Sequence, residues 1–183
     1  MLGVWNIGEK YIDTRHNVGF EITKRFVEKN APCVERKFKR STVYECKCAG
    51  KTIAVCHPNT YVNNSGLAAK ELFEHYGIAE DKMLVVIDDF NLNLATVRFR
   101  KSGSDGGHNG LKSIIANSSK DFARLRFGIG PLPEEQTVVE FVLGKFDEKE
   151  KEFVSQKLDF AVEAIECYFE HGIVATMNNY NAK

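Results

Sequence analysis

The sequence predicts a single α/β domain over residues 1–183, in which a twisted mixed β-sheet is flanked by α-helices. Short apolar runs, which are typical of buried strands, alternate along the chain with longer segments whose apolar residues recur at helical spacing. A length of 183 residues is sufficient for one hydrophobic core, and no internal repeat, linker or low-complexity segment divides the chain. With 43% hydrophobic and 27% charged residues, the composition is that of a globular protein.

The chain begins with a predicted strand, a loop and a helix. Residues 2–5 are apolar and form a short buried strand, which ends where a polar turn begins the loop 6–16. Asn17 then stands at the N-cap of a helix. The apolar face of this helix is formed by Val18, Ile22 and Phe26. His16, the last residue of the loop, therefore lies at a helix entrance.

A β-hairpin and a second helix follow. The alternating segments 43–48 and 52–56 are joined by a short turn, which predicts two antiparallel strands. Pro58 ends the second strand, because proline cannot donate a hydrogen bond to the ladder. In the next helix, Ser65 is the expected N-cap and Gly77 the expected terminating residue.

The second half of the chain begins with a continuous apolar run over residues 83–87, which predicts a strand buried on both faces. We expect this strand to end at Asp88. A basic strand over 97–101 then leads into the Gly-rich loop 102–110, which feeds a short helix. The free N–H groups at the start of that helix are suited to bind an anion or a carbonyl. A further strand is predicted over 124–129.

The strongest helix prediction comes after an acidic segment that begins at Glu134. Asp147 and Glu150 form a capping box, an apolar stripe follows, and Gly172 ends the helix. We expect this helix to serve packing alone. The tail, 173–183, has no pattern that predicts a structure.

Composition indicates a cytoplasmic protein. The 25 basic and 25 acidic residues give a formal net charge of zero, so a nucleic acid would have to be bound by a local basic patch. The five cysteines are odd in number and lack disulfide-framework or zinc-ribbon spacing, which indicates reduced thiols, with Cys46 and Cys48 as packing residues. No signal-peptide pattern begins the sequence, and no segment approaches the roughly 18 apolar residues that a membrane span needs.

Polar residues follow three of the predicted strands. In open α/β sheets, ligands bind beyond the carboxyl ends of the strands, and these positions hold Asn6, Asn63 and Asp88. A histidine with a carboxylate partner acts as a general base near neutral pH, and asparagine amides bind a peptide backbone or stabilise an oxyanion. This combination suits hydrolysis of an acyl ester. The candidate residues are Asn6, His16, Asn63, Asp88, Asp89, Arg100, His108, Asn109 and Arg126.

Each candidate also has a structural interpretation. A histidine at a helix start can be a cap or core residue, Asp and Asn favour turns and caps, and two arginines can form a solvated strand face. His57, before a proline, is expected to be structural. No serine or cysteine has the context of a nucleophile elbow, which favours an activated water over an acyl-enzyme. The scattered histidines and Asp88 lack the helical spacing of zinc enzymes, so we expect no metal and no other cofactor.

Several motifs resemble those of bacterial peptidyl-tRNA hydrolase. They follow one another in the family's order and extend over nearly the whole chain. The matching segments are 14–20, 58–66, 88–92, 106–114, 124–131 and 141–144. The resemblance implies a monomeric, metal-free α/β domain that cleaves the ester between a peptide and the 3′ ribose of tRNA, with no membrane and no obligate protein partner.

The resemblance also implies roles for individual residues. His16 would activate water and Asp88 would orient His16. The residues implied to bind the peptide or the oxyanion are Asn6, Tyr11, Val62, Asn63 and Asn109. The residues implied to contact the tRNA are Arg100, His108 and Arg126, the first and last as phosphate-binding groups and His108 at the 3′ end.

The chain departs from the family pattern around the peptide site. Ile7 replaces a usual proline, Val62 a usual methionine and Asn91 a usual aspartate, and residues 93–96 lack the usual proline and glycine. These changes are expected to alter the shape of the pocket. Two other hypotheses remain: a non-catalytic RNA-binding relative of the same fold, which would need no His–Asp pair, and a metal-dependent amidase or nuclease.

Overall fold

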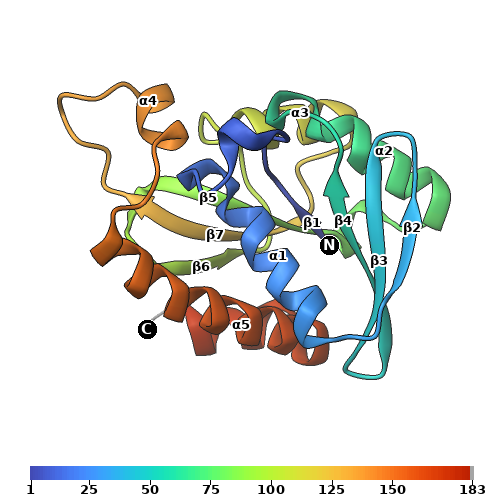
Figure 1. The fold of residues 1–183 in the computed structure, drawn as a ribbon. Helices are drawn as coiled ribbons and strands as arrows, with labels where there is room; N and C mark the ends of the chain where they lie inside the picture. Colours follow the sequence, from blue (N-terminus) through green and yellow to red (C-terminus); the bar gives the residue numbers. More distant parts are fainter. Residues whose placement is uncertain (182–183) are drawn as a thin grey trace.

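The computed structural model describes residues 1–181, which form a seven-stranded sheet with helices on both faces (Figure 1). The strands are β1 (Leu2–Gly3), β2 (Val34–Lys37), β3 (Ser41–Cys48), β4 (Lys51–Pro58), β5 (Leu84–Asn93), β6 (Val97–Arg100) and β7 (Ala123–Gly130). The α-helices are α1 (Val18–Lys29), α2 (Ser65–Tyr76), α3 (Asn109–Asn117), α4 (Val138–Leu143) and α5 (Glu148–Tyr180). Short 3₁₀ turns are η1 (Glu9–Tyr11), η2 (Arg15–Asn17), η3 (Val62–Asn64) and η4 (Glu80–Lys82).

The sheet is mixed, with strand order β2-β3-β4-β1-β5-β7-β6. The four central strands β4, β1, β5 and β7 are parallel to one another, whereas β2, β3 and β6 pair antiparallel at the two edges. The predicted α/β fold with a mixed sheet is therefore confirmed. Because the parallel strands all end at one edge of the sheet, their loops meet there, as the sequence predicts.

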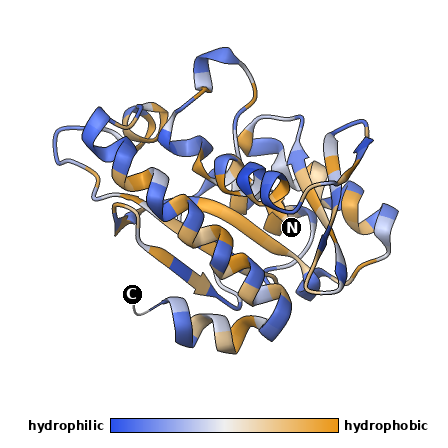
Figure 2. Ribbon diagram, turned by 60° about the horizontal axis from the view of Figure 1, so that its bottom comes forward, coloured by the Kyte–Doolittle hydropathy of each residue, from blue (hydrophilic) through white to orange (hydrophobic). Residues whose placement is uncertain are grey.

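Two hydrophobic cores lie on opposite faces of the sheet, and Figure 2 shows hydrophobic central strands between the helices. One core contains Ile22 and Phe26 of α1 and Leu158 of α5, packed on alternate residues of β5 and β7. The other contains Leu72 of α2 and Ile114 of α3. The central strands are apolar on both faces because both faces are covered.

Helix α1 sits unusually close to the sheet at Gly19. A Cβ atom at Gly19 would lie 2.5 Å from the carbonyl oxygen of Val86 and 2.8 Å from that of Val4. Glycine is required here because any side chain would collide with the backbone of β5 or of the residue after β1. This close approach places the start of α1, with η2 before it, beside the carboxyl ends of β1 and β5.

Two expectations about element boundaries are wrong, and a third is right in position only. The strand that contains Asp88 does not end there, because β5 continues to Asn93 and Asp88 still pairs with Phe127 of β7. Ser65 does not cap α2; it is the first helical residue, and its hydroxyl donates to the carbonyl of Val62. Asn17 is the N-cap residue of α1, as expected, but its side chain bonds the loop and not the helix.

The expected helix ends are confirmed at three positions. Asp147 and Glu150 form the capping box that begins α5, and Gly77 ends α2 in the left-handed conformation. Helical geometry breaks at Gly172, with φ 81°, but a second helical segment follows to Tyr180. The sequence pattern did not reveal that segment, nor β2, nor α4.

The prediction that all cysteines are reduced is wrong, because Cys33 and Cys46 form a disulfide. The pairing of β2 with β3 explains it. Val34 lies opposite Glu45 in the antiparallel register, so Cys33, one residue earlier, lies opposite Cys46. Sequence spacing does not show this proximity, which depends on an edge strand that the sequence did not predict. Within residues 1–181, no helix is long and apolar enough to cross a membrane.

Candidate active site

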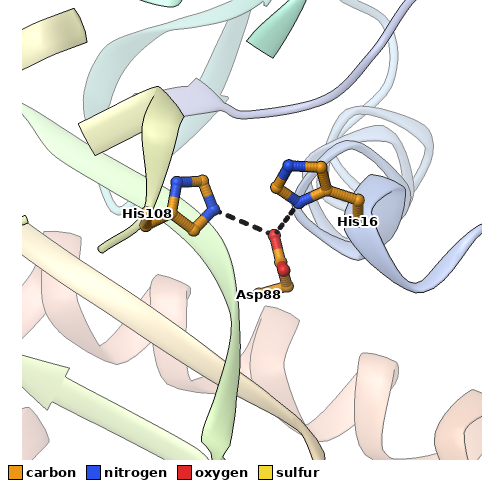
Figure 3. A group of neighbouring side chains, drawn as sticks. All are labelled: His16, Asp88 and His108. Carbon is orange, nitrogen blue, oxygen red and sulfur yellow. Dashed lines mark hydrogen bonds and ion pairs between the residues drawn. The ribbon is translucent and has the colours of Figure 1, made fainter. Parts of the chain in front are cut away.

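His16 and Asp88 are in direct contact, as expected. His16 Nδ1 lies 2.7 Å from Asp88 Oδ1 (Figure 3), and both residues are buried. His16 comes from η2 at the entrance to α1, and Asp88 comes from the end of the apolar part of β5. The two residues are 72 positions apart in the chain and meet because α1 packs against β5.

His108 bonds the same carboxylate oxygen. Its Nε2 lies 3.0 Å from Asp88 Oδ1, while its Nδ1 accepts hydrogen bonds from the backbone N–H groups of Gly110 and Leu111 at 3.0 and 3.3 Å. His108 is thus the N-cap of α3. The sequence predicts that free N–H groups at the start of this helix could bind an anion or a carbonyl. Two of these N–H groups instead donate to the His108 side chain. Since Nδ1 accepts, the ring proton of His108 is on Nε2 and points at Asp88.

The contacts among His16, Asp88 and His108 set the pKa values of Asp88 and His16. Burial raises the pKa of Asp88, but the neighbouring His16 and His108 outweigh burial and hold that pKa well below its ordinary range. Burial lowers the pKa of His16, but Asp88 outweighs it and raises the pKa above its ordinary value of 6.5. Asp88 is therefore a carboxylate that accepts from both rings.

One nitrogen of His16 remains for chemistry. Because Nδ1 donates to Asp88, the neutral ring carries its lone pair on Nε2, which points away from the carboxylate in Figure 3. In the part of the chain that the structure describes, no protein group bonds this nitrogen. An imidazole whose tautomer is fixed by a carboxylate can act as a general base.

Asn6 is held by a residue that the sequence analysis did not place in the site. Asn17 Oδ1 accepts from the N–H of Asn6 at 2.8 Å, and Asn17 Nδ2 donates to the carbonyls of Asn6 and Tyr11 at 3.1 and 2.8 Å. The Oδ1 of Asn6 accepts from the N–H of Val62 at 2.9 Å. Asn6 therefore keeps its Nδ2 donor for a ligand. The sequence shows Asn17 directly after His16, but there Asn17 was interpreted only as a helix cap.

Asn63 and Asn109 are exposed on neighbouring elements. Asn63 lies on η3 and Asn109 is the first residue of α3, and η3 packs against α3. Tyr11 on η1 is partly exposed and makes an edge contact with the ring of Tyr61. The side chain of Val62 is 3% exposed and packs in the core under α2 and α3.

The basic residues assigned to the tRNA line a pocket together with His108. A pocket of about 220 Å³ lies between β5, β7 and the Gly-rich loop, and its lining includes Arg100, His108 and Arg126. Arg126 Nε donates to Asp89 Oδ2, so part of its guanidinium is already paired. The structure thus brings Arg100, Arg126 and His108 to one pocket.

Arg124 in the same pocket is a second residue that the sequence analysis missed. It is buried, and its guanidinium donates to the carbonyls of Gly103, Ser104 and Lys120 at 2.8 to 3.1 Å. Its role is to hold the Gly-rich loop against β7. The sequence analysis considered a solvated strand face for Arg100 and Arg126 and assigned no role to Arg124, which is buried beneath the Gly-rich loop.

A larger cavity of about 1150 Å³ lies at the amino ends of the parallel strands, and Met1, Ile53, Tyr168 and Ile173 are among its lining residues. None of the predicted site residues lines it. Pocket size therefore does not identify the site, and we assign the site from the side-chain chemistry at the carboxyl ends of the strands.

His16, Asp88 and His108 are far apart in the sequence, but the side-chain atoms that could ligate a metal lie within 4.8 Å of one another. The hydrogen bonds argue against a cation among them. The ring proton of His108 is on Nε2, and a metal at that nitrogen would move the proton to Nδ1, which faces two backbone N–H groups. The cluster fits a hydrogen-bonded base better than a metal centre.

Known proteins resemble the chain along its whole length. A family model described as peptidyl-tRNA hydrolase matches residues 1–183. A protein of Fervidobacterium nodosum named peptidyl-tRNA hydrolase is 40% identical over 185 residues, which cover 100% of this chain and 95% of the relative. A protein of Lachnospira eligens with the same name is 37% identical over 180 residues, covering 98% and 97%. The crystal structure of peptidyl-tRNA hydrolase from Acinetobacter baumannii superimposes with a TM-score of 0.92 at 28% identity, covering 99% and 93%.

Proposed function

The chain belongs to the peptidyl-tRNA hydrolase family, a family of carboxylic ester hydrolases, and on that premise we propose that it cleaves the ester between a peptide and the 3′ ribose of tRNA. The observation that carries the proposal is the hydrogen bond from His16 Nδ1 to Asp88 Oδ1, which leaves His16 Nε2 as a base. The products are a free peptide and a tRNA that can be charged again.

In the proposed reaction, His16 Nε2 takes a proton from water as the water oxygen attacks the ester carbonyl carbon. Asp88 stabilises the imidazolium that forms, because its carboxylate is bonded to Nδ1. When the tetrahedral intermediate collapses, the bond to the ribose oxygen breaks and the imidazolium returns the proton to that oxygen. No covalent intermediate with the protein forms.

The asparagines are assigned to the acyl side. Asn6 Nδ2 is the donor left after its oxygen bonds Val62, which suits it to an oxyanion or a peptide carbonyl. Asn63 and Asn109 each offer a donor and an acceptor, the pair that a peptide backbone presents. Tyr11, which is partly exposed, is assigned to the same side, and the buried Val62 would support it through packing. Backbone contacts would allow peptides of many sequences.

The tRNA is assigned to the pocket with Arg100, His108 and Arg126. Arginine N–H groups bind phosphate oxygens and position a nucleic acid without reading its sequence. The residues assigned to both substrates come from one chain, which supports a monomer. We also propose that it acts in the cytoplasm, where translation produces peptidyl-tRNA.

Turnover in a chelator tests the ester hydrolase against both remaining hypotheses. We expect protein treated with a transition-metal chelator to release tRNA from N-blocked aminoacyl-tRNA at the untreated rate, because the proposed base needs no cation. A chelator that spares Mg²⁺ keeps the tRNA folded. Activity lost in chelator and restored by a metal would support the metal-dependent enzyme, and no turnover at high protein concentration would support the non-catalytic RNA-binding relative.

The salt dependence of tRNA binding tests the basic pocket. Arg126→Gln is expected to weaken binding of uncharged tRNA and to reduce the slope of log K against log salt by about one, because one phosphate contact is lost. Arg36→Gln is the matched control, since Arg36 is exposed on β2 at the other edge of the sheet. An Arg126 variant with the slope of the control would remove Arg126 from the tRNA site.

A further inference from the structure

Two histidines donate to one oxygen of Asp88. His16 Nδ1 lies 2.7 Å from Oδ1 and His108 Nε2 lies 3.0 Å from the same atom (Figure 3). The two rings approach from different elements, with their centroids 5.1 Å apart. The oxygen that bonds the proposed base is therefore shared with a second imidazole donor.

The second donor is held firmly in place. The Nδ1 of His108 accepts from two N–H groups at the start of α3, which fixes both the ring and its tautomer. Gly110 makes room for this ring, because a Cβ at Gly110 would lie 3.0 Å from Cε1 and 3.2 Å from Nδ1 of His108. Upstream, Arg124 holds the loop through the carbonyls of Gly103 and Ser104. His108 is therefore positioned by the backbone to donate to Asp88.

Other charged groups around the cluster do not provide this donor. Charged residues on the surrounding elements include Arg15, Asp89, Asp105, Arg124, Arg126 and Glu150. Arg15 pairs with Glu150 at the start of α5, and Arg126 pairs with Asp89 on the opposite face of β5. Asp105 accepts from the N–H of Gly107, and Arg124 donates to backbone carbonyls. Among the described residues, only the side chains of His16 and His108 bond the Asp88 carboxylate.

A hydrogen bond to a carboxylate oxygen withdraws part of its negative charge, so an oxygen with two donors holds each one less strongly. We propose that His108 is a positioning residue that adjusts the base: by sharing Asp88 Oδ1, it weakens the hold of Asp88 on the protonated form of His16. His16 then releases its proton at a lower pH than it would beside an unshared carboxylate. The catalytic consequence rests on the proposed hydrolase function, whereas the effect on His16 does not.

The test uses His108→Asn, which separates the two bonds of His108. Asparagine is a preferred N-cap, and its Oδ1 takes the place of Nδ1, so the cap of α3 is kept. Its side chain is too short to reach Asp88. We expect the pKa of His16, measured by NMR titration of the free protein, to rise by about one unit. The acid limb of the profile of kcat/KM against pH should move to higher pH by the same amount. This shift lowers kcat/KM about tenfold at pH values below that limb.

His171→Asn is the matched control, because His171 is exposed on α5 and should leave the pKa of His16 unchanged. An unchanged pKa of His16 in His108→Asn would overturn the inference, even with full turnover. A raised KM with an unmoved acid limb would also overturn it and would leave His108 as a tRNA contact only. Failure of the wild type to turn over would overturn the hydrolase proposal, while the NMR titration would still decide the inference.

Discussion

His16→Ala is expected to lower turnover of peptidyl-tRNA about 10²- to 10⁴-fold, which is the range that a general base contributes. Without the imidazole, no group near Asp88 takes the proton from the attacking water, since His108 presents its proton-bearing nitrogen to Asp88. Affinity for uncharged tRNA should remain within a few-fold, because the arginines of the tRNA pocket lie on β6 and β7. The substitution therefore separates chemistry from binding.

Single-turnover release of tRNA and a binding titration with uncharged tRNA measure the two effects. His57→Ala is not a suitable control, because His57 is buried against Phe20 and Tyr44, and burial lowers its pKa to about 4. The exposed His171→Ala is suitable. Parallel loss of turnover and tRNA binding in His16→Ala would refute the assigned role, since it would point to a collapsed site.

Asp88→Asn is expected to lower turnover by about 10² to 10⁴, because an amide of the same shape carries no charge to stabilise the imidazolium. The pH profile should change as well. Activity needs neutral His16, so in the wild type it is lost as the pH falls through the pKa of His16, which Asp88 raises above 6.5. Without the carboxylate, burial alone acts and lowers that pKa, so the acid limb should move to lower pH.

This shift of the acid limb is opposite in direction to the one expected for His108→Asn. The two variants therefore test the same proposal, that Asp88 Oδ1 sets the pKa of His16. The measurement is kcat/KM over the range from about pH 5 to 9, with thermal unfolding to confirm that the variant folds. Turnover in Asp88→Asn close to that of the wild type, or an acid limb that stays in place, would show that Asp88 does not act through His16.

Local patterns predicted most of the elements. Apolar spacing identified α1 and α2, alternation identified the β3–β4 hairpin, and the capping box at Asp147 and Glu150 located the start of α5. Patterns of this kind depend on neighbours within a turn or a strand, which the sequence displays directly. The edge strand β2 has no such apolar pattern, and the apolar run of α4 spans only six residues, too few to show helical spacing. β2 is exposed throughout, and it forms by pairing with β3.

Local patterns in the sequence identified His16, Asp88 and the three asparagines as candidates, because each follows a predicted apolar strand or stands near a predicted helix start. Their bonding partners follow from the tertiary structure alone. The shared oxygen of Asp88, the hold of Asn17 on Asn6, the anchoring of the Gly-rich loop by Arg124 and the Cys33–Cys46 disulfide all join residues that meet through folding. Their geometry follows from strand register and from the close packing of α1 and α3 on the sheet, which depend on the whole chain at once.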